Sequence, residues 1–127
     1  MTSTAPPRCG IDSVEIARIE RLLRETPAED LAKLWTATEL RDAGDGPGRA
    51  ASLAARFAAK EACLKLFPRE TALNALVATD FGVSRDAFGA PQVVASPAAQ
   101  AAMQRHRIVR IGLSMTHDRA SASAVAL

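Results

Sequence analysis

Apolar and polar residues follow two different periods along the chain, and these periods predict its helices and strands. Residues 8–14 alternate tightly between apolar and polar around GIDSV, which predicts a strand. In residues 15–25, four large aliphatic side chains recur at the spacing of one helical face, and three arginines lie on the opposite side. Pro27 ends this predicted helix.

Two short helices are predicted before the middle of the chain. Residues 28–35, AEDLAKLW, read as the first of them. The second begins at TATEL, where Thr36 and Glu39 have the spacing of a capping box, and is expected to run to about Ala43. The glycine-rich stretch GDGPG, residues 44–48, then breaks the helical pattern.

The longest predicted helix covers about residues 50–67, which contain no glycine or proline, and Pro68 closes it. Glu61 shares a stripe of this helix with Phe57 rather than lying on a polar face. Two interpretations follow. Glu61 forms an ordinary surface pair with Lys65, worth only about 0.2–0.5 kcal/mol, or it is a functional carboxylate at the edge of the core. The sequence pattern predicts no role for the neighbouring residue, Lys60.

The second half of the chain is richer in predicted strands. Two runs, residues 75–84 and 91–96, flank a turn-like RDAFGA and predict a hairpin. A proline suits the first turn of a helix over residues 97–107. Two more strands, 108–116 and 120–127, are separated by HDR. Because the strands group apart from the helices, the order predicts an α+β domain with an antiparallel sheet.

Length and composition indicate one globular domain. The chain has 127 residues, 48% of them hydrophobic and 24% charged. The polar, proline-rich residues 1–7 predict a flexible N-terminus, which leaves residues 8–127 as the single domain. Much of the apolar content is alanine, and this favours oligomerisation as a further source of buried surface.

The charge and residue content exclude several classes of function. A net charge of +2 suits an anionic ligand or an acidic partner but falls short of the basic stripe of a nucleic-acid binder. The start of the chain lacks the apolar core of a signal peptide, and no long apolar run predicts a membrane span, so a cytoplasmic location is expected. Cys9 and Cys63 have no zinc-like spacing, and Cys63 is expected to be a buried hydrophobe.

Asp12 and His117 are further candidates for chemistry. Asp12 lies in the first predicted strand, where it either faces solvent or marks a site. His117 lies between two strands and is either a turn residue or a phosphate contact or acid–base group. Asp12 and Glu61 together would suit Mg²⁺, which takes one or two carboxylates plus substrate phosphates. Nothing in the pattern itself brings these two residues together.

Four ordered segments resemble a known family. They are GIDSVEIARI, RFAAKEACLK, FGAP and SMTHDRASASAVAL, and together they cover nearly the whole chain. Each resembles a block of the holo-[acyl-carrier-protein] synthases, the small AcpS-type 4′-phosphopantetheinyl transferases. The resemblance implies the 4′-phosphopantetheinyl transferase fold, in which a small antiparallel sheet packs around one long helix. It also implies a homotrimer with active sites at the subunit interfaces.

The reaction implied by this resemblance moves 4′-phosphopantetheine from coenzyme A to a serine of an apo acyl carrier protein. Adenosine 3′,5′-bisphosphate is released, and Mg²⁺ is the cofactor. The carrier would belong to fatty-acid synthesis, a polyketide pathway or a multidomain synthase. The alternative is a catalytically silent relative that only binds coenzyme A or a carrier protein.

Individual residues inherit expected roles from their matching positions. The resemblance implies that Asp12 and Glu61 bind the metal and that Lys65 binds phosphate. It implies that Arg56 and His117 bind the nucleotide and its 3′-phosphate, and that Gly89 and Pro91 line the coenzyme A cleft. It also implies that the carrier protein docks on Arg18 and Arg21. It leaves open whether Glu61, His117 or a water accepts the serine proton. A row of arginines suits an acidic carrier because complementary charge steers association.

Two positions depart from the family pattern. After the long helix the family often has a glycine-containing loop, whereas this chain reads KLFPRETALN. Glycine permits close approach of backbone to a ligand, so this loop is expected to follow another path. Asp118 follows the histidine of the last block, where a threonine is frequent. It is either an extra acidic group near the metal or a turn residue.

Overall fold

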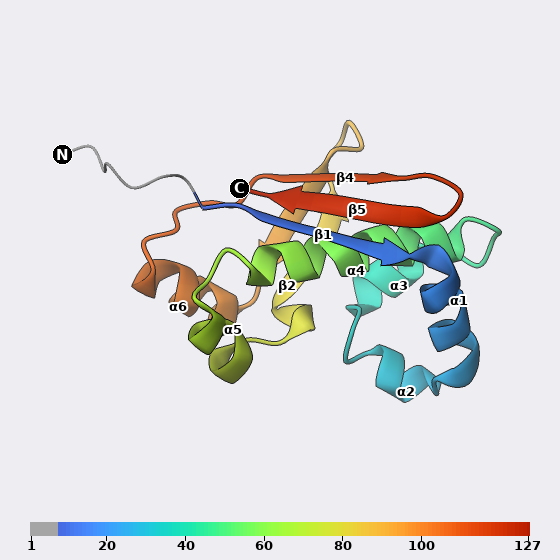
Figure 1. Cartoon of the computed structure of the whole chain (residues 1–127), viewed down its shortest axis with the longest axis horizontal. Coiled ribbons are helices and arrows are strands. Elements are labelled where there is room, and N and C mark those ends of the chain that lie inside the picture. The colour runs from blue at the N-terminus through green and yellow to red at the C-terminus, as the bar shows by residue number, and fades with distance from the viewer. Residues whose placement is uncertain (1–7) are drawn as a thin grey trace.

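A three-stranded antiparallel sheet lies along one long helix, as the sequence predicts (Figure 1). The computed structural model describes residues 8–127, so the predicted flexible segment 1–7 lies outside the described residues. The sheet has the order β1-β5-β4, formed by β1 (Gly10–Glu15), β5 (Ser121–Ala126) and β4 (Leu113–His117). The helix is α4 (Arg49–Leu64), which packs against both β1 and β5.

Small side chains let the sheet approach α4 closely. Every second residue of β5 is a buried alanine, and α4 presents buried alanines in return. The closest approach is at Gly10 of β1, where an added Cβ would lie 2.0 Å from the carbonyl oxygen of Ala62. Only glycine fits at such a contact. The alanine content noted in the sequence therefore serves a thin, tightly packed core.

The other helices gather at the two ends of α4 (Figure 1). Near one end lie α1 (Ile16–Glu25), α2 (Ala28–Leu31) and α3 (Ala37–Asp42). Near the other end lie α5 (Arg69–Ala75) and α6 (Pro97–Arg105). None of the helices within residues 8–127 combines the length and the apolar character needed to cross a membrane.

The capping box predicted before α3 is confirmed. The Thr36 hydroxyl accepts the N–H of Glu39 at 3.2 Å, and the Glu39 carboxylate accepts the N–H of Thr36 at 2.8 Å. The preceding residue, Trp35, is fully buried and donates its indole N–H to the Leu53 carbonyl at 3.0 Å. The capping box fixes the start of α3, and the indole bond joins that start to α4.

The predicted hairpin forms a second, two-stranded sheet from β2 (Phe81–Arg85) and β3 (Pro91–Ala95). Its turn is held by Asp86, whose carboxylate accepts the backbone N–H groups of Phe88 and Ala90. Gly89 in this turn has a φ of 84°, in the left-handed region that favours glycine.

A buried ion pair covers the edge of β2 that does not face β3. The ammonium of Lys60 binds the Glu39 carboxylate, and both side chains have no solvent exposure. The same ammonium donates to the Phe81 carbonyl at 3.0 Å, while Glu39 accepts the Val83 N–H at 3.1 Å. Burial lowers the pKa of Lys60. The structure thus gives Lys60 a structural role in joining α3, α4 and β2.

Several predicted boundaries are wrong. The helix expected over residues 28–35 ends at Leu31, and His117, expected between the last two strands, is the final residue of β4. The long helix ends at Leu64 rather than near residue 67, and the unpredicted α5 follows after Pro68. The strand expected over residues 75–84 begins only at Phe81, because Asp80 closes a 3-10 turn, η1 (Ala78–Asp80), by accepting the Val77 N–H at 2.7 Å. The strand expected over residues 108–116 begins only at Leu113.

Candidate functional site

Asp12, Glu61 and Lys65 come together where β1 crosses the end of α4. Lys65 Nζ lies 3.3 Å from Asp12 Oδ1 and donates to the Ile11 carbonyl at 2.8 Å. Asp12 is on the face of β1 that also carries the buried Val14, so it points towards α4. The surface pair between Lys65 and Glu61, one of the two interpretations open from the sequence, does not form among the described residues, where Lys65 pairs with Asp12 instead.

The electrostatics of Glu61 tie it to the same cluster. Burial raises the pKa of the half-buried Glu61 carboxyl, and the charge of nearby Asp12 raises this pKa further. The cations Lys65 and Arg18 act in the opposite direction. Two carboxylates that repel each other in this way would be relieved by a bound cation.

A cavity of about 350 Å³ opens beside Glu61 and Lys65. Its opposite wall is α5, which contributes Arg69, Ala72 and Leu73 from one face of the helix. This is the segment that departs from the family pattern. This chain has a helix where the family often has a glycine-containing loop, and the helix adds a cation and an exposed leucine to the cavity.

A second cavity, of about 190 Å³, gathers two arginines and a histidine. Arg56 from α4, Arg85 from β2 and His117 from β4 all line it. Arg56 is only 1% exposed and donates from Nη1 to the Ser52 hydroxyl and carbonyl. Its Nε is buried without a hydrogen-bond partner. Burial lowers the pKa of Arg56, and the neighbouring charge of Arg85 lowers this pKa further.

Pro91 and Gly89 differ in their relation to this second cavity. Pro91, the first residue of β3, lines it. Gly89 lies in the hairpin turn and is not among the lining residues, but its carbonyl accepts a hydrogen bond of 2.8 Å from Arg85. Gly89 is therefore linked to the cavity only by its hydrogen bond to Arg85, which lines it.

The two cavities lie on different sides of α4. Arg56 and Glu61 are five positions apart, which corresponds to about 140° around the helix axis. No residue lines both cavities. The predicted carboxylate residues and the predicted nucleotide residues therefore lie at two separate places in one copy of the chain.

The arginines of α1 that were expected to dock a carrier are exposed. The Arg18 guanidinium lies over the Phe57 ring, 5.6 Å from its centroid, in cation–π geometry. Arg18 also influences Glu61, so this end of α1 lies close to the carboxylate cluster. Arg21 is exposed on the same helix.

Asp118 is a turn residue. Its carboxylate accepts the backbone N–H groups of Ala120 and Ser121, each at 2.8 Å, and these bonds lower its pKa. Of the two interpretations open from the sequence, the structure supports the turn residue.

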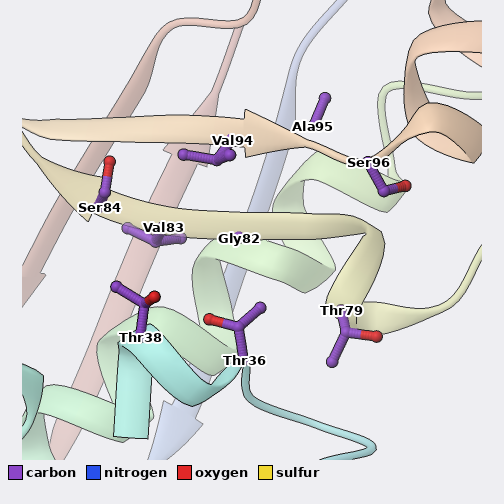
Figure 2. Close-up of a pocket in the computed structure, with 9 residues that line it drawn as sticks. All are labelled: Thr36, Thr38, Thr79, Gly82, Val83, Ser84, Val94, Ala95 and Ser96. Carbon is purple, nitrogen blue, oxygen red and sulfur yellow. The ribbon is translucent and has the colours of Figure 1, made fainter. Parts of the chain in front are cut away.

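A further hollow of about 280 Å³ lies between the start of α3 and the β2–β3 hairpin (Figure 2). Thr36 and Thr38 border it from α3, and Val83 and Val94 come from the two strands. No charged side chain and no predicted site residue lines it. It offers little to a diphosphate, whereas both cavities beside α4 carry cations.

Sequence reasoning missed Arg85 and Arg69. Each lines a cavity with predicted site residues, but neither belongs to a recognisable motif. The only signal for Arg85 is its place next to the turn that carries Gly89. Arg69 lies in the segment KLFPRETALN, which differs from the family pattern, so no motif assigns it a role.

Comparisons with known proteins identify the family of the chain. A family model described as the 4'-phosphopantetheinyl transferase superfamily matches residues 8–122. A holo-[acyl-carrier-protein] synthase from Anaeromyxobacter dehalogenans (strain 2CP-1 / ATCC BAA-258) is 38% identical over 112 residues, which cover 86% of this chain and 84% of that protein. The corresponding enzyme of Moorella thermoacetica is 38% identical over 120 residues, covering 93% and 90%.

Solved structures show the same likeness. The holo-[acyl-carrier-protein] synthase of Neisseria meningitidis superposes with a TM-score of 0.80 at 28% identity, covering 96% of this chain and 97% of that one. The enzyme of Helicobacter pylori, solved in complex with coenzyme A, gives a TM-score of 0.76 at 29% identity, covering 94% and 97%. The chain therefore belongs to the holo-[acyl-carrier-protein] synthases, a family of enzymes within the 4'-phosphopantetheinyl transferase superfamily.

Proposed function

We propose that this chain transfers 4′-phosphopantetheine from coenzyme A to a serine hydroxyl of an apo acyl carrier protein and releases adenosine 3′,5′-bisphosphate. The observation that carries the proposal is the cluster in which Lys65 lies between Asp12 and the Glu61 cavity. Two carboxylates and a lysine around an anion-sized cavity suit a diphosphate. The structure of the Helicobacter pylori relative in complex with coenzyme A supports the choice of donor.

The donor set fits Mg²⁺. Magnesium takes one or two carboxylates and completes its shell with water and substrate phosphates. Asp12 and Glu61 supply such a pair, and no group of three acidic, histidine or cysteine residues gathers anywhere in residues 8–127. When bound, Mg²⁺ would neutralise charge on the diphosphate.

The chain's own residues bind and orient the reacting groups. Lys65 reaches a diphosphate in the Glu61 cavity from the end of α4 and offsets its negative charge. Asp12 holds Lys65 in position through their ion pair. His117 lines a cavity together with two arginines, Arg56 and Arg85, and this setting favours a phosphate contact over accepting the serine proton. The proton then passes to Glu61 or to a water.

A second copy of the chain is needed to bring an Arg56 cavity and a Glu61 cavity together. The Arg56 cavity and the Glu61 cavity face different sides of α4, so one elongated coenzyme A molecule is not expected to span both within one copy. A closed homotrimer would place the Glu61 cavity of one protomer beside the Arg56 cavity of the next.

The carrier is expected to dock against α1. Arg18 and Arg21 are exposed, and Arg18 lies near Glu61, so an acidic partner bound here would present its serine to the carboxylate cluster. Complementary charge at such a surface raises the association rate.

The direct test is to mix the protein with an apo carrier protein, coenzyme A and Mg²⁺ and to weigh the carrier by mass spectrometry. A gain of one phosphopantetheine group is the expected result. The segment KLFPRETALN, which differs from the family pattern, favours one alternative. In that alternative the chain is a catalytically silent relative that binds coenzyme A without transferring its phosphopantetheine. Binding of coenzyme A with no mass gain on several carriers would establish that alternative.

A further inference from the structure

The helix α5, which forms the opposite wall of the Glu61 cavity, is weakly held by its own sequence. It has seven residues, and none of them is buried. Pro68 precedes it, and no side chain caps its N-terminus. Isolated helices shorter than about 12–15 residues are marginal in water, so α5 depends on contacts with other elements for its position.

The neighbouring helix α6 supplies such a contact through His106, the half-buried residue that caps its end (Figure 1). The Thr71 hydroxyl of α5 lies 3.0 Å from His106 Nε2, and the two groups share a hydrogen bond. Within residues 8–127 this is the only side-chain hydrogen bond that joins α5 to another element. A hydroxyl both donates and accepts, so the bond forms with either tautomer of the ring.

The same imidazole also contacts the link between α4 and α5. Phe67 lies in this link and lines the Glu61 cavity. Its ring meets the His106 ring edge-on, with 6.0 Å between the ring centroids. Phe67 is buried and packs against Phe81 on another side, so its position is fixed. His106 therefore holds both the link and the middle of α5, and with them the angle between α4 and α5.

This angle sets the shape of the Glu61 cavity. Glu61 and Lys65 line it from α4 and its C-terminal cap, whereas Arg69 and Leu73 line it from α5. Thr71 is two positions from each of these α5 residues, about 200° around the helix axis, so its bond to His106 lies behind the wall. A wall that is held before a ligand arrives does not have to be ordered on binding, and such pre-organisation raises affinity.

We propose that His106 is a positioning residue, which through Thr71 holds α5 in the place where the Glu61 cavity accepts the diphosphate of coenzyme A. This rests on the proposed function for the identity of the ligand and for its place in this cavity. Neither His106 nor Thr71 lines the cavity. The pair therefore acts on the affinity for coenzyme A and not on the chemical step.

The first measurement is hydrogen exchange by mass spectrometry on the full chain without ligand. Thr71→Val removes the hydroxyl at almost constant volume, and His106→Phe keeps an aromatic ring against Phe67. We expect each variant to raise the exchange rate of α5 severalfold and to leave α4 unchanged. Thr71→Ser retains the hydroxyl and should behave like the wild type. The matched control is Thr38→Val, because Thr38 is an exposed threonine of α3 whose hydroxyl is bonded to Arg41 on its own helix.

The second measurement is the affinity for coenzyme A by titration calorimetry, without carrier protein. Thr71→Val and His106→Phe should each weaken binding about 2- to 10-fold, the usual effect of losing one hydrogen bond. The double variant should bind no more weakly than the single variants, because all three lack the same bond. In the transfer assay the KM for coenzyme A should rise by a similar factor while kcat stays unchanged.

The inference is overturned if Thr71→Val leaves the exchange of α5 or the affinity for coenzyme A at the wild-type value. Faster exchange throughout the chain would also overturn it, because the bond would then serve general stability. So would additive losses in the double variant, or a fall in kcat with an unchanged KM. A wild-type chain that binds no coenzyme A would refute both this inference and the proposed function. If exchange and affinity respond as expected but no carrier is modified, only the proposed function is refuted.

Discussion

Asp12 and Lys65 form an ion pair 53 positions apart in the sequence, with Lys65 Nζ 3.3 Å from Asp12 Oδ1. The pair lies at the point where β1 meets the end of α4, next to the half-buried Glu61. It joins a predicted metal ligand to a predicted phosphate-binding residue, so its two members are expected to act together.

Removing either carboxylate should stop transfer while leaving the fold intact. Asp12→Asn and Glu61→Gln keep the side-chain shapes but remove the charges that would hold Mg²⁺. We expect the rate of carrier modification to fall roughly 10²- to 10³-fold, the usual effect of losing one group that stabilises transition-state charge. Circular dichroism should be unchanged. Asp45→Asn, at an exposed loop position, is the control. Full activity in both carboxylate variants would refute the metal assignment.

The buried pair of Lys60 and Glu39 should be essential for stability. Lys60→Met leaves the Glu39 carboxylate buried without its cation, and breaking a buried pair in this way costs about 3–5 kcal/mol. Urea denaturation measures the loss. The matched control is Lys33→Met, because Lys33 pairs with Asp30 at the surface and such pairs contribute about 0.2–1 kcal/mol. Equal losses in the two variants would contradict the structural role of Lys60.

Gly10→Ala should separate β1 from α4. The new Cβ would lie 2.0 Å from the Ala62 carbonyl oxygen, and backbone at that position cannot move aside as a side chain can. Overpacking of this kind costs about 1–3 kcal/mol, and the shift should also lower transfer, because β1 carries Asp12. Thermal unfolding and the carrier assay measure the two effects. Gly46→Ala meets no atom within 4 Å and should change neither.

The two cysteines should differ sharply in reactivity. Cys9 is exposed, whereas Cys63 is buried in α4 and burial raises the pKa of its thiol to about 12. The thiolate is the reactive form, so Cys63 should stay unmodified at pH 8. A thiol reagent should label one cysteine in the native protein and both in denaturant. Rapid labelling of Cys63 in the native protein would show that α4 is less tightly packed than described.

Charge reversal on α1 should affect the carrier and not the donor. Arg21→Glu places a carboxylate on the surface expected to meet an acidic carrier. We expect the KM for the carrier to rise severalfold, and the effect to shrink at high salt, because exposed charges act mainly on association. The KM for coenzyme A should not change. Arg105→Glu, exposed on α6, is the control. An equal effect of both changes would place the docking surface elsewhere.

Local patterns predicted the elements whose stability is local. The absence of glycine and proline predicted α4, and the Thr36–Glu39 spacing predicted the start of α3. The pattern does not predict α5, because RETALNA follows directly on a proline and a proline at that place predicts the end of helical structure. The position of α5 depends on its packing against α6, and a local sequence pattern does not predict such a long-range contact.

Local sequence patterns predicted less of the candidate site than of the fold. The location of Lys60 in the core depends on Glu39, 21 positions away, and that of Lys65 depends on Asp12. Residue types alone left Glu61 with two interpretations. Resemblance to a family supplied the site residues, but it did not supply Arg85, which lies outside the matching FGAP segment and lines its cavity from β2.

The hydrogen bonds that Glu39 and Lys60 make to β2 also have a consequence for behaviour at high concentration. An exposed strand edge invites a strand from another molecule, and proteins protect such edges to prevent aggregation. Here the carboxylate and the ammonium occupy the positions that an incoming strand would use at Val83 and Phe81. A chain that loses either partner would therefore be prone to edge-to-edge association as well as less stable, and these two residues are expected to change only together.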